Sequence, residues 1–192
     1  LTLGRRQGDT KVNEMGEESV ITSERRFRRA TMADWPTMLK IYEHARKLMA
    51  SNGNPTQWGD KFPREEVVRD DVESQRTVLL VDTVDGEERV LAQFALCPGI
   101  DPTYVNIDGA WLDDDPYVTI HRIASSGLAK GAAKDCINWC IEHYGNVRAD
   151  THPNNKAMQH VLESNGFARC GLIQLLDRPF DTTRIAYQRH EW

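Results

Sequence analysis

Residues 125–140 read SSGLAKGAAKDCINWC, which places glycine, alanine and lysine directly before an alanine-rich apolar segment. Small residues leave backbone N–H groups accessible, and the first turn of a helix carries unpaired N–H groups with a partial positive charge. Together these donors can bind an anion such as a diphosphate, and Lys130 could add a screened positive charge. Glycine and alanine also precede helices where packing is tight, so this stretch alone leaves both interpretations open.

A second candidate for chemistry is His121, on the β-rich run YVTIHRIA that covers residues 117–124. An imidazole can take a proton near neutral pH, directly or through water, but histidines also pack half-buried without function. Ser125 ends the same run and could either orient a water or close a turn. In a regular strand Arg122 would face away from His121, and we expect it to be an ion-pair partner.

The elements that position these residues alternate between helix and strand in the second half of the chain. We expect helices from Trp35 to about Met49, after Pro63, after the glycine stretch to Tyr144, and over 153–165, with Asp34 as the first N-cap. We expect strands near Phe27 and over 77–81, 89–97, 117–124, 146–151, 167–175 and 184–190, with a hairpin at Asp85-Gly86. This order predicts a single α/β domain over 25–192, with helices on a mixed sheet, after a polar tail over 1–24.

Composition limits the class of protein. The chain has 192 residues, of which 40% are apolar and 28% charged, and its net charge of −5 gives no footprint for nucleic acid or an anionic membrane. Four scattered cysteines without a CxxC pair predict neither a disulfide framework nor a metal site; Cys136 and Cys140 should fill one helix face. Reduced thiols, and the lack of a signal-type or membrane-spanning apolar stretch, favour the cytoplasm.

The stretch 117–167 resembles the acyl-CoA-binding core of the GNAT superfamily of N-acyltransferases. That family has a Q/R-x-x-G-x-G/A turn, matched here by Leu128, Gly131 and Ala133, and an "N…GF" pattern, matched by Asn155 and the pair 166–167. The order of strands and helices from residue 27 to the end also agrees. The earlier NPTQW segment (residues 54–58), followed by a proline-started helix, is similar to many uncharacterised bacterial members.

The resemblance implies a mostly antiparallel mixed sheet flanked by helices and an enzyme that transfers the acetyl group of acetyl-CoA to a primary amine of a small molecule or peptide. For this reaction we expect His121 as the base and Ser125 as a second catalytic candidate. The resemblance implies an acceptor site that includes Trp58 and Tyr117, each of which could equally be core. The cofactor-binding residues implied are Ile123, Ala124, Ser125, Leu128, Ala129, Lys130, Gly131, Ala132, Ala133 and Asn155. Asn155 could instead serve only as a helix cap. A homodimer is possible for enzymes of this kind.

Two departures from the family pattern bear on activity. Leu128 replaces the usual Gln or Arg of the turn, and Leu162 stands where many members carry a Tyr that protonates the departing thiolate. The missing Tyr leaves a second class of function open, a non-catalytic acyl-CoA-binding sensor or interaction module. A dinucleotide-binding unit is disfavoured, because no GxGxxG lies near the first strand with an acidic residue about 20 positions on. The aspartates at 113–115 could attract a cationic amine, although such runs are usually solvated loops.

Overall fold

The computed structural model describes residues 24–191, so the tail expected over residues 1–24 lies outside the described residues except for its last residue. The helices are α1 (Trp35–Ser51), α2 (Glu65–Glu73), α3 (Ala132–Tyr144) and α4 (Lys156–Ser164), with short 3-10 turns at Met32–Asp34 and Pro102–Tyr104. The strands are β1 (Arg26–Arg29), β2 (Thr77–Val84), β3 (Glu87–Pro98), β4 (Asp108–Gly109), β5 (Val118–Ser125), β6 (Asn146–Thr151), β7 (Ala168–Gln174) and β8 (Thr183–His190). Every expected helix and strand is present, and the short β4 is an addition.

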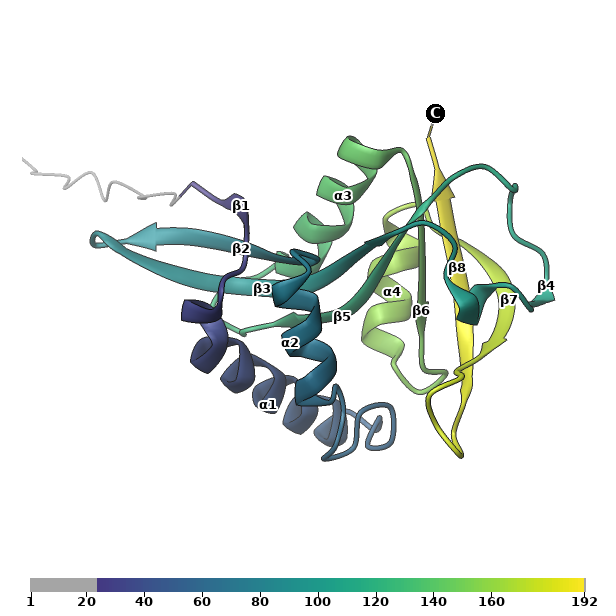
Figure 1. Ribbon diagram of the computed structural model, residues 1–192, viewed down its shortest axis with the longest axis horizontal. Coiled ribbons are helices and arrows are strands. Elements are labelled where there is room, and N and C mark those ends of the chain that lie inside the picture. Colours follow the sequence, from purple (N-terminus) through teal and green to yellow (C-terminus); the bar gives the residue numbers. More distant parts are fainter. Residues whose placement is uncertain (1–23, 192) are drawn as a thin grey trace, which may run out of the picture.

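The strands form one sheet in the order β1-β2-β3-β5-β6-β8-β7-β4 (Figure 1). All neighbouring strands are antiparallel except β5 and β6, which are parallel. This arrangement confirms the predicted mixed, mostly antiparallel sheet. The parallel pair follows from the connection through α3, because a parallel crossover needs a long link, usually a helix.

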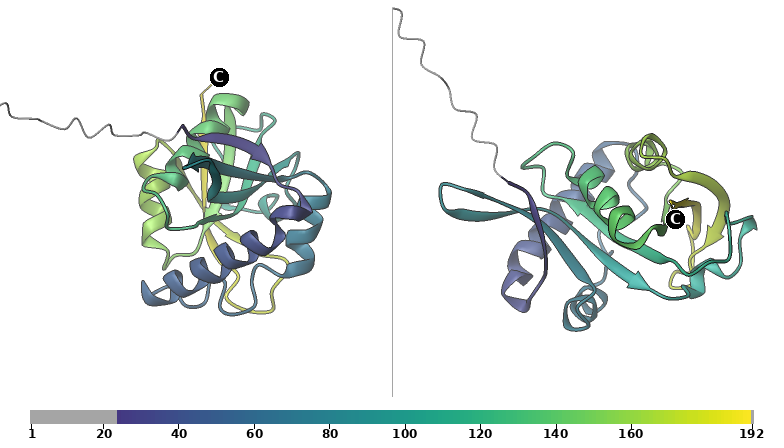
Figure 2. Two further views of the ribbon diagram at one scale, coloured as in Figure 1. Left: turned by 90° about the vertical axis from the view of Figure 1, so that its left-hand side faces the viewer. Right: turned by 90° about the horizontal axis from the view of Figure 1, so that it is seen from above.

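Helices cover both faces of the sheet. On β2, side chains alternate: Val78 and Leu80 belong to the core under α3, whereas Leu79 and Val81 belong to the core under α1 and α2. The left panel of Figure 2 shows α3 and α4 on one side of the strands and α1 and α2 on the other. Two apolar layers therefore hold the sheet from opposite sides.

Within the first layer, Cys136 and Cys140 of α3 are fully buried, which confirms their predicted role as apolar fillers of one helix face. Burial raises the pKa of both thiols, so neither is prone to ionise. Across residues 24–191, no helix combines the length and the apolar character that crossing a membrane requires.

The start of α1 differs in detail from the expectation. Asp34 stands at the N-cap position but makes no side-chain cap bond to α1. Its carboxylate instead accepts from the backbone N–H of Thr31 at 2.9 Å and from Arg28, which closes a capping box around the preceding 3-10 turn. The ion pair therefore ties the end of β1 to the start of α1.

The sheet opens between β5 and β6. These strands pair only at Val118–Val147 and Thr119–Arg148, and Figure 1 shows β5 sloping away from the upright β6. Such a split leaves one edge of β5 without a strand neighbour, so its backbone groups are available to a ligand.

A β-bulge lies on β5 beside this split. Gln93 pairs with Ala124 and Ala95 with His121, so one residue more lies between the paired positions on β5 than on β3. Arg122 takes a left-handed backbone with φ of 54°. The expectation that Arg122 faces away from His121 was wrong for this reason: the strand is not regular, and both side chains line one cavity.

Candidate active site

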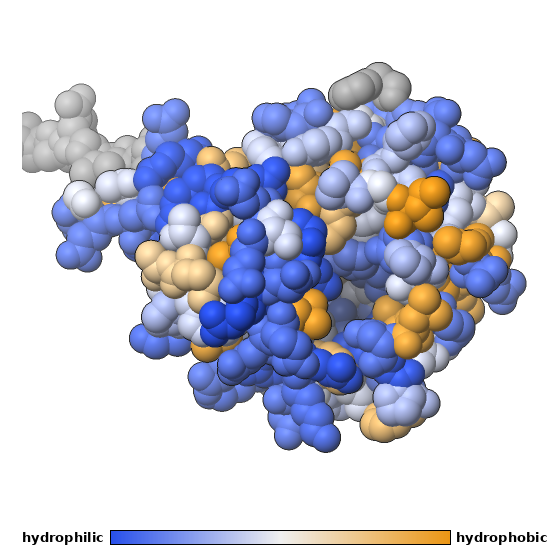
Figure 3. Space-filling model, viewed as in Figure 1, coloured by the Kyte–Doolittle hydropathy of each residue, from blue (hydrophilic) through white to orange (hydrophobic). Residues whose placement is uncertain are grey.

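A cavity of about 800 Å³ occupies the split between β5 and β6. Its opening is visible in Figure 3 as the hollow at the centre right of the molecule. β5 contributes residues 120–123, and β6 contributes residues 149–151. Further lining residues come from the α1–α2 connection and α2, from the segment after β3, from α3 and α4, and from the β7–β8 connection and β8. The cavity is therefore built by both halves of the sheet.

His121 and Asp101 form a hydrogen-bonded pair in the wall of this cavity. Nε2 of His121 lies 2.5 Å from Oδ2 of Asp101, which comes from the segment after β3. Burial opposes ionisation of Asp101, but the hydrogen bond and charge of His121 prevail and lower the pKa of the carboxyl. An ionised carboxylate on Nε2 fixes the ring orientation and leaves Nδ1 as the nitrogen that can accept a proton.

A second polar pair, Tyr104 and Asp150, lies on the β6 side of the cavity. The hydroxyl of Tyr104 donates to Oδ2 of Asp150 on β6 at 2.7 Å, and the ring of Tyr104 lies beside that of His121, with 6.0 Å between centroids. Burial and the charge of Asp150 raise the pKa of Tyr104, so its phenol stays protonated. Asp150 therefore presents a hydrogen-bonded carboxylate to the cavity across from His121.

An ion pair fixes the bulge. Asp71 of α2, whose side chain is 3% exposed, accepts from Nε and Nη2 of Arg122 at 2.7 and 3.0 Å. It also accepts from Nε of Arg76 at 3.1 Å. The bidentate geometry fits guanidinium to carboxylate, and it confirms that Arg122 is an ion-pair partner. The strained backbone of β5 is thus held from α2.

The glycine stretch lies at the open amino end of α3. Gly131 is the N-cap with φ of 74°, no side chain caps the helix, and a Cβ built there meets nothing nearer than 4.0 Å, an Arg25 nitrogen. Gly131, Leu128 and Lys130 are exposed. Their backbone groups are accessible, so the requirement for an anion-binding turn is met. Ile137, six positions farther along α3, lines the cavity and links the two regions.

Arg25 is a residue near this turn that the sequence interpretation missed. Its guanidinium donates to the carbonyl of Lys130 at 2.8 Å and to Asp135 at 2.5 Å. Asp135 belongs to the first turn of α3, where its charge would repel an anion. The ion pair with Arg25 cancels that charge. No local motif reveals this, because 110 positions separate the partners.

Other predicted residues reach the cavity in different ways. Asn155 caps α4, as its side-chain oxygen accepts from Met158 N at 3.1 Å, and its amide nitrogen donates to Gln57 at 2.9 Å. Trp58 is 7% exposed and packs edge-on against Tyr42, yet it also contributes to the cavity wall, as do Asn155 and Leu162. Asn155 therefore serves as a helix cap and also lines the cavity.

Several candidates lie outside the cavity wall. Ser125 ends β5 opposite Ala92, and Tyr117 uses its hydroxyl to accept from the backbone N–H of Asp101 at 3.0 Å. Tyr117 therefore supports the loop that carries Asp101. The roles of Ala124 and of residues 128–133 toward a cofactor remain predictions from the family pattern.

The acidic run at 113–115 also lies outside the cavity. Asp113 accepts from Asn146 at 3.1 Å and lies 2.7 Å from Nδ1 of His190, at the other end of β6 from the cavity. Its carboxylate holds the connection before β5 against β6 and β8. This position does not fit the expectation that the run draws a cationic amine into the acceptor site.

No protein-family model and no curated protein sequence matches the chain. Among solved structures it is similar to a GNAT-family acetyltransferase from Streptococcus agalactiae, with 29% identity and a TM-score of 0.75 over 88% of this chain and 96% of that chain. A putative acetyltransferase from Staphylococcus aureus shares 22% identity, with a TM-score of 0.61 over 85% and 97%. A chain of the NatC complex bound to Gag peptide and CoA shares the fold at 15% identity and a TM-score of 0.53 over 88% and 99%. The chain therefore has the GNAT fold and is similar in sequence and structure to a GNAT-family acetyltransferase.

Proposed function

We propose that this protein transfers the acetyl group of acetyl-CoA to the primary amine of a small molecule or peptide, by direct attack while both substrates are bound. The observation that carries the proposal is the His121–Asp101 pair in a cavity that Ile137 of α3 also lines. Acetyl-CoA supplies an activated acyl thioester when bound. The chain must then align it with an amine and accept a proton.

The residues present fit the cofactor. Gly131, Ala132 and Ala133 offer helix N-terminal N–H groups without a competing side-chain cap, as a diphosphate requires. Ile123 lies on the edge of β5 that has lost its strand neighbour, where backbone groups can hold an extended arm. The salt bridge from Arg25 to Asp135 keeps the first turn of α3 favourable to an anion.

His121 is assigned as the base. Its side chain is 21% exposed, so it is reachable from the cavity while Asp101, 12% exposed, holds its other nitrogen. The carboxylate stabilises the imidazolium that forms when Nδ1 takes the proton of the incoming amine. Asp101 is a positioning residue, because it acts through His121.

The chain offers no phenol at position 162 to protonate the departing thiol. Leu162 is 1% exposed and fills the cavity wall with an apolar side chain. A thiol pKa of about 8.5 makes a thiolate a tolerable leaving group near neutral pH. The reaction therefore requires a base from this protein more than it requires an acid.

The test is release of free thiol from acetyl-CoA across a panel of amines, corrected for hydrolysis without amine. We expect amine-dependent release that falls in His121→Ala while the affinity for CoA, measured by calorimetry, stays unchanged. Binding of CoA with no amine-dependent release from any amine would contradict the enzyme and favour the sensor module.

A further inference from the structure

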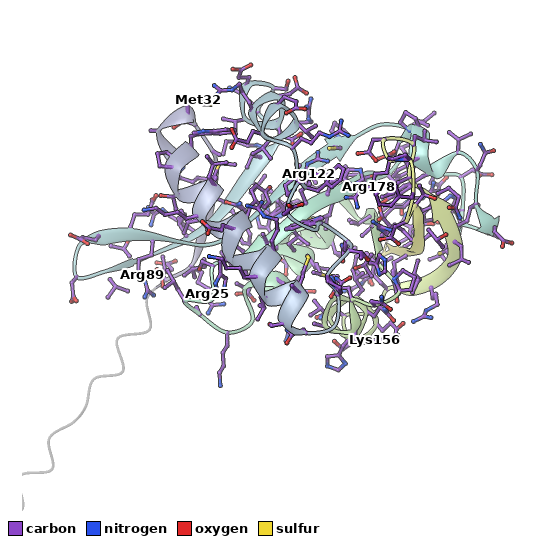
Figure 4. All side chains as sticks on the ribbon, turned by 90° about the horizontal axis from the view of Figure 1, so that it is seen from below. Arg25, Met32, Arg89, Arg122, Lys156 and Arg178 are labelled. Atoms are coloured by element: carbon purple, nitrogen blue, oxygen red, sulfur yellow. The ribbon has the colours of Figure 1, made fainter. Side chains whose placement is uncertain are left out.

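Two arginines of the cavity wall lie outside the proposed proton-transfer machinery. Arg178 belongs to the β7–β8 connection, and Arg184 belongs to β8. Figure 4 shows Arg178 toward the middle of the molecule, as it does Arg122 on β5. They occupy a different wall from His121, on the side where β8 and its preceding loop close the cavity.

Arg184 is 2% exposed, yet its guanidinium is incompletely bonded. Nη1 donates to the backbone carbonyls of Asp181 and Thr183, both at 2.8 Å. Nη2 is buried and has no hydrogen-bond partner among residues 24–191. An unpaired buried donor on a charged group is costly, because water can no longer solvate it.

Arg178 is similar. Its Nη1 donates to the backbone carbonyl of Gln57, and its guanidinium lies 3.8 Å from the centre of the Phe62 ring. Its Nε is buried without a partner among the described residues. A neutral carbonyl and an aromatic face hold the guanidinium in place but do not supply a full counter-charge.

Within residues 24–191, neither arginine has a carboxylate oxygen within the 4.0 Å of an ion pair. The nearby acids are engaged elsewhere or remain farther away: Asp150 accepts from Tyr104, and Asp181 pairs with His152 at 2.9 Å. Asp177 lines the cavity but is exposed and beyond that distance. Arg122, in the same cavity, is fully paired with Asp71, so the lack of pairing is particular to the β7–β8 side.

The electrostatics agree with this geometry. Burial lowers the pKa of Arg178, and burial together with the charge of Arg178 lowers the pKa of Arg184. The charges of Asp150, Asp177 and Asp181 act in the opposite direction but do not outweigh these causes, so two like charges share a poorly solvated wall. A planar anion would satisfy both, since guanidinium groups match the geometry of a carboxylate.

We propose that Arg178 and Arg184 bind a carboxylate of the acceptor, so that the substrate is an amino-acid-like compound with its amine toward His121. This inference rests on the proposed function. The same carboxylate chemistry could reach the arginines from a dicarboxylic acyl group on the donor. We favour the acceptor, because the arginines lie on the β7–β8 wall, whereas the predicted path of the cofactor follows β5 and α3.

The first experiment compares acceptors that differ only in the carboxylate. Thiol release is measured with L-α-amino acids and ω-amino acids from glycine to 5-aminopentanoate, each paired with its primary amide. For at least one pair, we expect kcat/KM to favour the acid by about tenfold or more, as charge-assisted bonds provide. A second arm replaces acetyl-CoA with succinyl-CoA and an uncharged amine. Preference for succinyl-CoA, with no preference among acceptors, would place the carboxylate on the donor and overturn the proposal.

Arg178→Gln tests the residue, and Arg169→Gln is the matched control. Arg169 pairs with Glu163 on the surface and lies outside the cavity wall, so its loss should leave the acid-to-amide preference unchanged. In Arg178→Gln we expect KM for the acid to rise about tenfold, with KM for the amide and for acetyl-CoA unchanged. Unchanged preference in the variant would overturn the assignment.

A binding measurement separates this inference from the proposed function. The melting temperature of the full chain is measured with the same amino acids and amides, without acetyl-CoA, in wild type, Arg178→Gln and Arg178→Lys. We expect the acids to raise it in wild type, less in Arg178→Lys, and not in Arg178→Gln. This pattern without acyl transfer would support the carboxylate site and refute the enzyme. If amides are acetylated as fast as acids and the acids do not raise the melting temperature, the enzyme is supported and the carboxylate site is refuted.

Discussion

Nε2 of His121 and Oδ2 of Asp101 lie 2.5 Å apart, which joins a residue of β5 to the segment after β3 in one wall of the cavity. Asp101 binds Nε2 of His121, so Nδ1 is the nitrogen left for the proposed proton transfer. Asp101 is itself held, because its backbone N–H donates to Tyr117 and its Oδ1 accepts from Thr103 N. The orientation of His121 therefore depends on a segment after β3 that is itself fixed by hydrogen bonds.

Replacing His121 with alanine should lower kcat by about 100-fold or more, the usual contribution of a general base. KM for acetyl-CoA should stay within about twofold, because His121 does not belong to the anion-binding turn. The measurement is steady-state thiol release with a saturating amine.

His160→Ala is the matched control for that variant. His160 is exposed on α4, away from the cavity wall, and its loss should leave kcat unchanged. Equal kcat in wild type and His121→Ala would remove His121 from the mechanism.

The carboxyl of Asp101 predicts a pH dependence of stability. Its pKa in the folded chain lies below the ordinary value of 3.8, because the His121 hydrogen bond and charge outweigh burial. A lowered folded pKa adds stability that is fully present well above the unfolded pKa and is lost as pH falls through the folded pKa. As pH falls from about 5 toward 3, the stability advantage of wild type over Asp101→Asn should therefore shrink.

Urea unfolding of both proteins at several pH values measures this advantage. Asp70→Asn removes an exposed carboxylate of the same type and should show no such change. An advantage for wild type that grows as pH falls from about 5 to 3 would contradict the assigned direction of the pKa shift of Asp101.

Local patterns predicted most of the fold. The Asp85-Gly86 hairpin, the helix ends at Gly145 and Gly166, and the alternation on β2 each depend on neighbours in the sequence. The bulge at Arg122 does not, because it appears only when β5 is set against β3, whose register is fixed by the whole sheet.

The site was only partly predictable for a similar reason. His121 and the turn before α3 carry recognisable chemistry in a short stretch. Asp101 is 20 positions from its partner, and Arg184 is notable only because its charge ends up buried without a counter-ion. Burial and pairing are properties of the folded chain, and composition contains no signal for them.

Gly131→Asp should abolish CoA binding while the chain still folds. A carboxylate at the N-cap would occupy the position of the anion and repel it. Gly131→Ala should cost about 1 kcal/mol of stability, because its φ of 74° favours glycine, and should weaken CoA binding less, since the space around it is open. Calorimetric titration with CoA measures both.

The control is Gly86→Asp, at the hairpin tip, where φ is 82° and nothing lies within 4 Å of the added Cβ. It carries the same backbone strain away from α3, so CoA affinity should remain at the wild-type value. Equal CoA affinity in Gly131→Asp and wild type would refute the anion-binding turn.

Asp71→Asn tests whether α2 holds the bulge of β5. The Asp71 side chain is 3% exposed and accepts two bonds from Arg122, so neutralising it leaves a half-buried guanidinium short of its counter-charge. Breaking such a pair costs about 3–5 kcal/mol. We expect a loss of that order in the free energy of unfolding, measured in urea.

Asp70→Asn provides the comparison on the same helix. Asp70 pairs with Arg76 at the surface, where its side chain is 67% exposed, so its neutralisation should change stability by less than about 0.5 kcal/mol. If Asp71→Asn lost as little as Asp70→Asn, the bulge would be held by β3 alone. Where the variant folds, a raised KM for acetyl-CoA would follow from the altered backbone at Ile123, the residue after the bulge that lines the cavity.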